Sequence, residues 1–382
     1  MTDTHRPDRR LFLQMAGLGA VTLAIPAAAQ GQGTDMLIVN ALGGFGNPNA
    51  VRQPGAIQGT RRREIEARMI ADAKASGMNA VNVTLGYVSG DMDPFEHSVR
   101  EIGLWDARLR RHQTDLIQVL TAADILRARE EGRIGVIYGF QNAAMMGTDA
   151  SRADIFADLG VRVIQLTYNP ANQIGDGSMA PGNRGVTPFG REVIAALNRN
   201  RVMVDLSHSG ERTCLEAAGI SRQPISINHT GCRALTDLPR NKTDAELRRV
   251  AERGGFVGIY FMPFLSPDSV AEPADVVAHI DHAVNVCGED HVGIGTDGGT
   301  TGVDDMAAYR ARTREEIAER RAAGIGAAGE TPDTLPFVER LSGPDQFRDL
   351  IRLLGQHGYS TGRSEKIMGL NFVRYAREVW GA

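Results

Sequence analysis

The sequence predicts an α/β fold, a closed (β/α)8 TIM barrel followed by C-terminal helices. Eight short apolar runs rich in β-branched residues recur along the chain, and a polar loop and a helical pattern follow most of them. Continuous apolar runs of this length are typical of parallel strands that are buried on both faces. Strands that alternate with helices predict a parallel sheet with helical crossovers, and eight such units are enough to close a barrel. The predicted strands are residues 36–40, 79–85, 134–140, 161–167, 202–206, 224–228, 256–260 and 291–296.

Helical patterns fill the intervals between these strands. In residues 61–76 apolar side chains recur at every fourth position, and Gly77 follows directly as a C-cap signal. Thr243 and Glu246 have the spacing of a capping box, which marks the start of another helix. The predicted helices are residues 61–76, 122–131, 152–159, 189–198, 211–218, 243–253 and 273–287, and apolar helices within 347–380 close the chain.

Two segments, 88–118 and 300–334, lie outside the strand–helix repeat as insertions. The second contains a highly charged helical pattern, which indicates a solvated helix or, because it follows the last strand, a lid over the site. An open doubly wound sheet is the alternative fold, and such sheets usually carry a glycine-rich phosphate turn after the first strand. The glycine-rich stretch 42–46 is not GxGxxG and no helical pattern starts there, so nucleotide binding is discounted.

Length, charge and cysteine content exclude several classes of protein. The chain has 382 residues and a formal net charge of −4 at pH 7. This charge is too small to indicate a nucleic acid or an anionic membrane surface as a partner. The three cysteines, Cys214, Cys232 and Cys287, are widely spaced without a CxxC pattern, so neither a disulfide framework nor a cysteine metal site is indicated. Beyond the N-terminal segment, no stretch is long and apolar enough to span a membrane.

The N-terminus has the features of an export signal. Arg9 and Arg10 precede a modest apolar run, and the small residues 26–29 follow as a cleavage site. Paired arginines before Leu-Phe-Leu are typical of a twin-arginine signal. We therefore expect residues 1–30 to be a signal peptide, residues 31–382 to form the barrel, and the mature chain to be periplasmic or secreted. An uncleaved N-terminus or a retained signal anchor is the alternative.

Polar side chains follow several predicted strands, at the end where enzymes of this fold place their chemistry. His208 and His229 each come directly after a strand, and Asp297 follows the eighth strand. Taken singly, each has a common structural role, as a hydrogen-bonded or turn residue. Together, two imidazoles suit a divalent metal such as zinc, which takes a third protein ligand in catalytic sites. Asp297 could supply that ligand or act as a general base.

The segment 132–297 resembles the membrane (renal) dipeptidase family of zinc metallopeptidases, which belongs to the wider amidohydrolase-like barrels. The resemblance rests on DLSH at 205–208, NHT at 228–230, RN at 240–241 and DHVGIGTD at 290–297, with further matches at 160–167, 254–258 and 366–372. It implies a (β/α)8 dipeptidase with two zinc ions. By this resemblance His208 and His229 are zinc ligands, Asp297 is a ligand beside the nucleophilic water, and Arg240 binds the substrate carboxylate. A guanidinium fork suits that last role.

The sequence departs from the family pattern at the other metal position. Leu42 and Gly44 stand where the family has an HxD pair, and Gln141 stands where it has a bridging glutamate. Tyr168 replaces a histidine that binds substrate. Because a neutral amide does not offset the charge of two cations, we expect at most one zinc ion per chain, held by His208 and His229.

The resulting hypothesis is an exported metallo-dipeptidase-like hydrolase that cleaves dipeptides or related small amides with metal-activated water. Asp297 and Tyr168 are the expected catalytic residues, with Tyr168 as oxyanion donor or as a core residue. Arg240, Gln141 and Asn169 are expected to bind the substrate. The alternatives are a binding protein that has lost turnover and an altered chemistry such as lactone hydrolysis or epimerisation. The oligomeric state stays open, a homodimer included.

Overall fold

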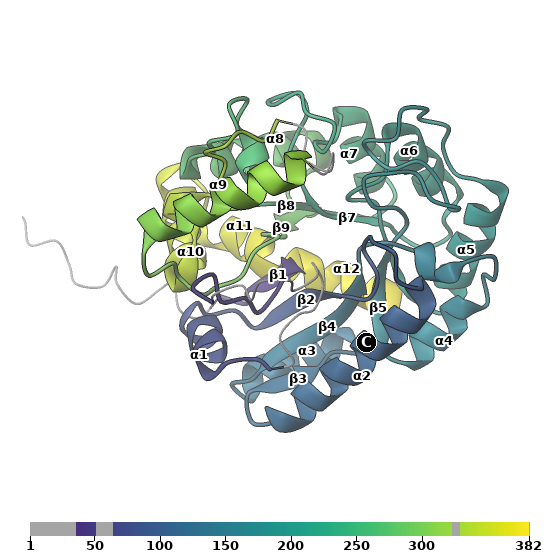
Figure 1. The fold of residues 1–382 in the computed structure, drawn as a ribbon, viewed down its shortest axis with the longest axis horizontal. Helices are drawn as coiled ribbons and strands as arrows, with labels where there is room; N and C mark the ends of the chain where they lie inside the picture. The colour runs from purple at the N-terminus through teal and green to yellow at the C-terminus, as the bar shows by residue number, and fades with distance from the viewer. Residues whose placement is uncertain (1–35, 51–63, 323–328, 382) are drawn as a thin grey trace, which may run out of the picture. The chain divides into compact units, whose positions relative to one another are not determined.

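A parallel sheet of nine strands forms the centre of the computed structural model (Figure 1). The structure describes residues 36–50, 64–322 and 329–381. Its strands are β1 (Val39–Gly43), β2 (Ala80–Leu85), β3 (Leu116–Gln118), β4 (Ile134–Phe140), β5 (Val161–Gln165), β6 (Met203–Asp205), β7 (Ser226–Thr230), β8 (Phe256–Ile259) and β9 (Val292–Ile294). All but β3 neighbour one another in chain order, from β1 to β9, and β3 pairs with β4. Each described pairing is parallel.

The first and last strands meet and nearly close the sheet into a barrel. The backbone N–H of Asp297 donates to the carbonyl of Leu42 at 2.9 Å. The Asn40 side chain accepts from the N–H of Thr296 and donates to its hydroxyl, both at 2.8 Å. This architecture confirms the predicted (β/α)8 TIM-barrel class.

Helices surround the barrel in the order that the crossovers require. They are α1 (Ala67–Ala75), α2 (Pro94–Arg111), α3 (Ala122–Glu130), α4 (Arg152–Asp158), α5 (Pro188–Arg199), α6 (Glu211–Ile220), α7 (Asp244–Ala251), α8 (Pro273–Cys287), α9 (Met306–Ala322), α10 (Gln346–Gln356), α11 (Thr361–Glu365) and α12 (Asn371–Trp380). The capping box of Thr243 and Glu246 opens α7 as predicted. Helix α12 packs Phe372 edge-on against Phe256 of β8, with ring centroids 5.3 Å apart, so the C-terminal helices complete the core.

The segment 88–118 is more than an inserted loop. It contains α2, which begins after Asp93 caps the N–H of Glu96 at 2.7 Å, and it ends in strand β3. Leu116 and Gln118 pair with the first half of β4, so this segment is part of the sheet. The sequence did not predict β3 because three residues are too few to show a strand pattern.

Pairing moves two strands relative to the predicted ranges. β1 runs from Val39 to Gly43, which places Leu42 inside the strand, and β7 runs to Thr230, which places His229 inside its strand. Thr230 is paired with Ile259 of β8. Pairing with neighbouring strands therefore extends both elements over residues that the sequence pattern places in the following loop.

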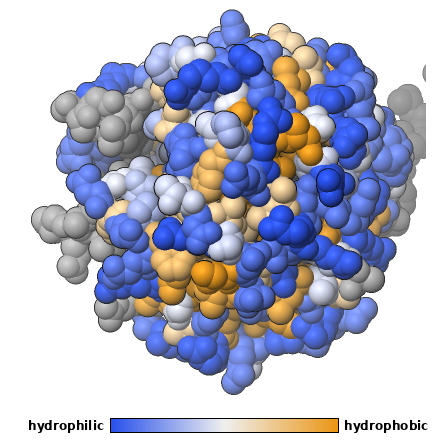
Figure 2. Space-filling model, turned by 90° about the vertical axis from the view of Figure 1, so that its right-hand side faces the viewer, coloured by the Kyte–Doolittle hydropathy of each residue, from blue (hydrophilic) through white to orange (hydrophobic). Residues whose placement is uncertain are grey.

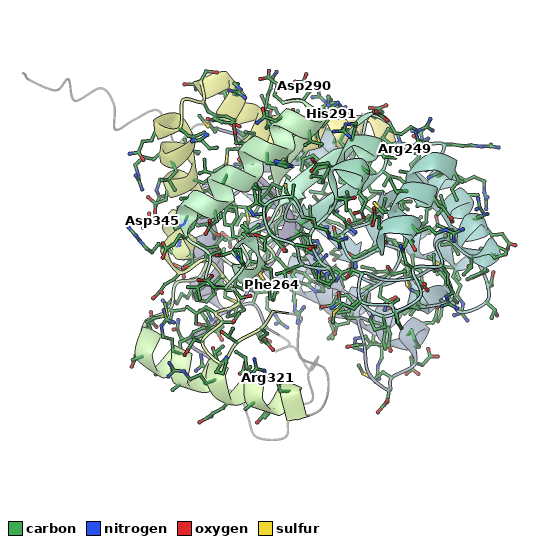
Figure 3. The ribbon with its side chains drawn as sticks, turned by 90° about the horizontal axis from the view of Figure 1, so that it is seen from above. Arg249, Phe264, Asp290, His291, Arg321 and Asp345 are labelled. Carbon is green, nitrogen blue, oxygen red and sulfur yellow. The ribbon has the colours of Figure 1, made fainter. Side chains whose placement is uncertain are left out.

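Helix α9, predicted as a charged helix, follows the loop after β9. Figures 1 and 3 show it along one side of the ribbon, with Arg321 near its C-terminal end. Its buried side is small: Ile317 is buried, and Tyr309 contacts the ring of Phe337 with centroids 5.5 Å apart. Arg314 pairs with Asp333 at 2.6 Å. The helix is thus attached to the segment after residue 328, and its action as a lid stays a prediction.

On the face shown in Figure 2, hydrophilic side chains surround small apolar groups. Across the described residues, no helix combines the length and the apolar character that a membrane span needs. The predicted signal peptide, residues 1–30, lies outside the described residues.

Candidate active site

Two histidines meet at the C-terminal ends of β6 and β7. Asp205, the last residue of β6, accepts hydrogen bonds from the N–H groups of Ser207 at 2.9 Å and Asn228 at 3.0 Å, so one buried carboxylate ties the two strand ends together. His208 follows on the turn, and His229 lies one residue beyond Asn228. Their Nε2 atoms are 3.0 Å apart. The sequence prediction that these two imidazoles converge is therefore met by the geometry.

The surroundings of His208 select its tautomer. Its Nδ1 lies 2.6 Å from the amide oxygen of Asn169, which can only accept, so Nδ1 carries the proton and Nε2 keeps a lone pair. The ring of Tyr168 stacks on the imidazole with centroids 4.2 Å apart. Tyr168 and Asn169 thus hold the ring orientation of His208. The Nδ1 atom of His229, by contrast, is buried and has no hydrogen-bond partner among the described residues.

Both imidazoles are in the neutral form that a metal ion requires. Burial lowers the pKa of His208 and of His229 well below the usual value, and the positive charge of Arg240 lowers it further. Lys242 acts in the same direction on both rings. Each neutral ring keeps one proton, so His229 Nε2–H donates to the lone pair of His208 Nε2 across the 3.0 Å contact. A metal ion bound by both Nε2 atoms would replace that proton.

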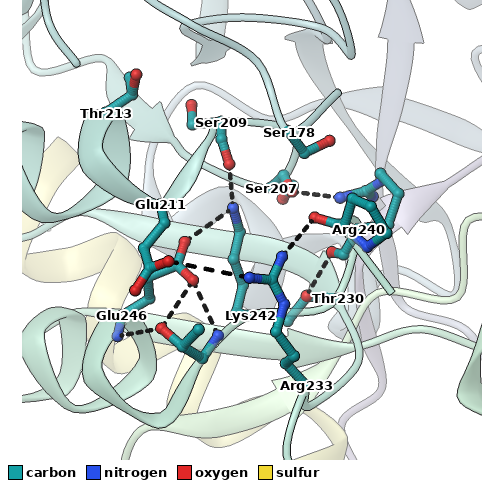
Figure 4. A network of polar contacts seen from close by, with 12 residues as sticks. Ser178, Ser207, Ser209, Glu211, Thr213, Thr230, Arg233, Arg240, Lys242 and Glu246 are labelled. Carbon is teal, nitrogen blue, oxygen red and sulfur yellow. Dashed lines mark hydrogen bonds and ion pairs between the residues drawn. The ribbon is translucent and has the colours of Figure 1, made fainter. Parts of the chain in front are cut away.

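Arg240 and Lys242 lie on the loop after β7, beside the turn that carries Ser207 and Ser209 (Figure 4). Nη1 of Arg240 donates to the carbonyl of Ser207, and Nζ of Lys242 donates to the carbonyl of Ser209. The guanidinium lies 6.0 Å from the ring centroid of Tyr260. Arg240 therefore uses one nitrogen on the protein, and its remaining N–H groups are chemically suited to a substrate carboxylate.

Asp297 lies on the opposite side of the site, where β9 meets β1. Its backbone has a φ of 59°, in the left-handed region that few residues other than glycine, asparagine and aspartate adopt. Burial raises the pKa of its carboxyl group to about 6, while Arg240 and a side-chain hydrogen bond from Gln141 oppose that rise. Burial also raises the pKa of the Tyr168 hydroxyl, and the Asp297 charge adds to this effect, so the hydroxyl remains a donor.

The donor set suits one metal ion better than two. The paired imidazoles supply two neutral nitrogens, the ligands that zinc accepts readily. On the opposite side Leu42 is a buried strand residue, Gly44 has no side chain, and Gln141 offers an amide. Within the described ranges, no group of three or more His, Cys, Asp or Glu side chains is arranged to hold a metal. Asp297 as a third ligand stays a prediction.

Sequence reasoning missed Lys242 and its partner Glu246. Both side chains are 1% exposed, and their charged atoms lie 3.2 Å apart. Their i, i+4 spacing was visible in the sequence, but this spacing is common for pairs on helix surfaces and gives no sign of burial. The contact of Lys242 with the turn that carries His208 is visible only in three dimensions.

Comparison with known proteins gives a consistent result. The family model described as "Membrane dipeptidase (Peptidase family M19)" matches residues 67–324. A protein named dipeptidase tcpJ, from Claviceps purpurea (strain 20.1), is 30% identical over 263 residues, 68% of this chain and 54% of the relative. The chain thus spans about half the length of that relative. An uncharacterised dipeptidase from Schizosaccharomyces pombe is 32% identical over 52% of this chain and 51% of its own length.

Solved structures share the architecture over nearly the whole chain. The crystal structure of an amidohydrolase from Pseudomonas aeruginosa matches with a TM-score of 0.75 and 28% identity, over 92% of this chain and 98% of that one. A metallopeptidase from Rhodobacter sphaeroides, solved with a phosphinate mimic of the dipeptide L-Ala-D-Ala, matches with a TM-score of 0.70 and 20% identity. That match covers 90% of this chain and 99% of the other, and at this identity it shows the fold alone.

Proposed function

This chain belongs to the membrane dipeptidase family, Peptidase family M19, and on that premise we propose that it is a hydrolase of dipeptides or related small amides. The observation that carries the proposal is the meeting of two neutral imidazoles, 3.0 Å apart, beside an arginine at the strand ends. His208 and His229 would hold one divalent ion, with Asp297 as a neighbour. A bound ion of this kind polarises a carbonyl and lowers the pKa of its water.

The side chains of the site have complementary tasks in such a reaction. Arg240 binds the carboxylate of the substrate with the N–H groups that Ser207 does not use, and so sets the position of the scissile amide. Asp297, with a pKa of about 6, is ionised at neutral pH and accepts a proton from the attacking water. The Tyr168 hydroxyl, which stays protonated, donates to the oxyanion that forms. Gln141 and Asn169 keep Asp297 and His208 in place.

A panel of dipeptides tests this proposal. Purified protein should release free amino acids from at least one dipeptide, and a chelator should abolish the release. His229→Ala should lose both the activity and the metal. His357→Gln, which changes a largely exposed histidine on the C-terminal side of α10, is the matched control and should keep both. Activity that survives chelation and the His229→Ala change would rule out a metal held by this pair.

A second candidate function is a binding protein that keeps the pocket without turnover. Leu42, Gly44 and Gln141 favour it, because they remove the ligands that the family resemblance implies for a second metal. In that case dipeptides should bind, as seen by calorimetry, with Arg240→Ala abolishing binding, and hydrolysis should be absent at every metal concentration. An altered chemistry on the same barrel, such as lactone hydrolysis, would appear as turnover of lactones in place of dipeptides.

We also propose that the chain is exported by the twin-arginine route, because Arg9 and Arg10 precede an apolar run and a small-residue cleavage site. Replacing both arginines with lysine keeps the charge but should leave the protein in the cytoplasm. Replacing Arg6 with lysine is the control and should leave export unchanged. Normal export of the double variant would overturn this route.

A further inference from the structure

Three consecutive carbonyl groups around His208 are each held by a different donor. The Ser207 carbonyl accepts from Nη1 of Arg240, and the Ser209 carbonyl accepts from Nζ of Lys242 (Figure 4). The His208 carbonyl between them accepts from the N–H of Ser178 at 2.7 Å. Two cationic side chains therefore donate hydrogen bonds to the main chain on both sides of the histidine. The turn that carries His208 has little freedom to move while these contacts persist.

Main-chain hydrogen bonds fix the segment that carries the two cations. The N–H of Asn241 donates to the carbonyl of Leu238 at 3.0 Å, in a turn that directly precedes Lys242. The N–H of Lys242 donates to the carbonyl of Gly231 at 3.0 Å, and its carbonyl accepts from the N–H of Arg233 at 2.8 Å. Arg240 and Lys242 both donate to carbonyls of the turn around His208, while the Asn241 side chain donates to two carbonyls elsewhere, at 2.8 and 3.0 Å.

Lys242 occupies an unusual environment for a lysine. Its side chain is 1% exposed, and its counter-charge, Glu246, is equally buried at 3.2 Å. The other carboxylate oxygen of Glu246 accepts from the N–H and the hydroxyl of Thr243, both at 2.9 Å. Because desolvation of two charges usually offsets their attraction, a buried pair of this kind adds little net stability. A role in positioning the main chain around His208 therefore explains this buried pair better than a contribution to stability.

We propose that Lys242, neutralised by Glu246, is a positioning residue that fixes the main chain of His208 and thereby aims its imidazole at His229. The inference rests on the proposed function in one respect, that this histidine pair is where the chemistry occurs. Lys242 touches neither ring and no reacting atom. It acts through the Ser209 carbonyl, as Arg240 acts through the Ser207 carbonyl.

A double replacement separates this role from a merely structural one. Lys242→Met alone leaves Glu246 as a buried uncompensated charge, so the melting temperature should fall sharply. Lys242→Met with Glu246→Gln removes both charges and keeps an amide oxygen for the capping box of Thr243. The double variant should regain most of the lost melting temperature. If the pair had only a structural role, the double variant would also regain the wild-type His208 signals and metal affinity.

The decisive readouts use the double variant after its stability has recovered. The imidazole ¹⁵N signals of His208 in metal-free protein should show a changed tautomer balance, and the affinity for Co²⁺ alone should fall about 10- to 100-fold, as for losses of outer contacts around metal ligands. If the protein hydrolyses dipeptides, kcat should fall with KM little changed. Recovery of the His208 signals and of the Co²⁺ affinity together with the melting temperature would overturn the inference.

The control replaces an exposed ion pair in the same way. Arg314→Met with Asp333→Asn removes a pair 2.6 Å apart between α9 and the segment after it, and should change none of these readouts. The ¹⁵N signals need neither metal nor substrate. An absence of hydrolysis therefore contradicts the proposed function without deciding the role of Lys242, and unchanged His208 signals contradict that role even in an active enzyme.

Discussion

At the C-terminal ends of the barrel strands, the side chains on the two sides of the candidate site are held in different ways. On the side of β5, β6 and β7, side chains with chemical function are held by the protein: His208 by Asn169 and Tyr168, and the turn around it by Arg240 and Lys242. On the side of β9 and β1, the backbone and Asn40 close the barrel, and the carboxyl group of Asp297 is the group with a proposed chemical task. There the backbone of Asp297 bonds to Leu42, and Asn40 bonds to Thr296.

This difference shows that the closure of the barrel and the assembly of a metal site are separable. Leu42 lies inside β1 with 2% of its surface exposed, and its carbonyl accepts from Asp297, so the seam forms without any metal ligand from β1. On the histidine side, two imidazole nitrogens lie 3.0 Å apart, and both are suited to bind one metal ion. The comparison predicts that changes on the two sides affect different properties.

The largest effect should come from His208→Ala on the histidine side. It removes one of two nitrogen donors, so bound metal should be lost. A metal that contributes about 4 kcal/mol to the transition state corresponds to about 10³-fold in kcat. Leu42→Val on the opposite side should leave the metal content unchanged and lower only stability, by about 1 kcal/mol. Elemental analysis measures the metal content of the two variants, and thermal unfolding measures their stability. Equal metal loss in both variants would contradict the proposed difference between the two sides.

Asp297→Asn should change the pH dependence of stability. The folded carboxyl has a pKa of about 6, above its unfolded value of 3.8, so the folded state binds the proton more tightly. Stability is then lost as pH rises from about 4 to above 6, by roughly 3 kcal/mol in total. The asparagine variant lacks this loss, so its stability relative to wild type should increase over that range. Urea unfolding of metal-free protein measures it, and a difference independent of pH would contradict the assignment.

Arg240→Lys should have a smaller effect, on substrate binding. Lysine keeps the charge but loses the fork that serves Ser207 and a carboxylate together, which corresponds to about 1.5–2.5 kcal/mol or roughly 10- to 70-fold in kcat/KM. The loss should disappear with a substrate whose C-terminal carboxylate is amidated. If the acid and the amide are affected equally, Arg240 has a structural role alone.

Tyr168→Phe should produce the smallest of these effects. Phenylalanine keeps the ring that stacks on His208 and removes only the hydroxyl. Loss of one neutral donor of about 1 kcal/mol corresponds to roughly fivefold in kcat, with unchanged KM and metal content. Tyr168→Ala removes the ring as well and should also weaken metal binding. Equal kinetics for the phenylalanine variant and wild type would assign Tyr168 to packing.

The fold was predictable because its main elements repeat one pattern, while local pairing decided the rest. Ile134–Phe140 and Pro273–Cys287 have the predicted bounds, since an apolar run and a proline at the helix start mark them unambiguously. β3 was not predicted because a strand of three residues is too short to show a repeating pattern of apolar and polar side chains. His229 proved to be a strand residue because β8 extends β7 by pairing, a contact between segments that no local pattern contains.

The site was predictable in its ligand types and not in its supports. Strand ends followed by His208 and His229 indicated convergence, and the structure brings these nitrogens together. The contact of Arg240 with Ser207 and the burial of Lys242 depend on how the loop after β7 folds against the turn after β6. Such contacts between loops have no signature in the spacing of one sequence.

We propose that the histidine side of the candidate site binds one metal ion and that the side of β9 and β1 binds none. The most direct test is the zinc content of residues 31–382 after incubation with excess Zn²⁺ and exhaustive dialysis, with His229→Ala as the matched control. We expect one zinc ion per chain in the wild type and none in the variant. Two zinc ions per wild-type chain, or one that persists in His229→Ala, would contradict it.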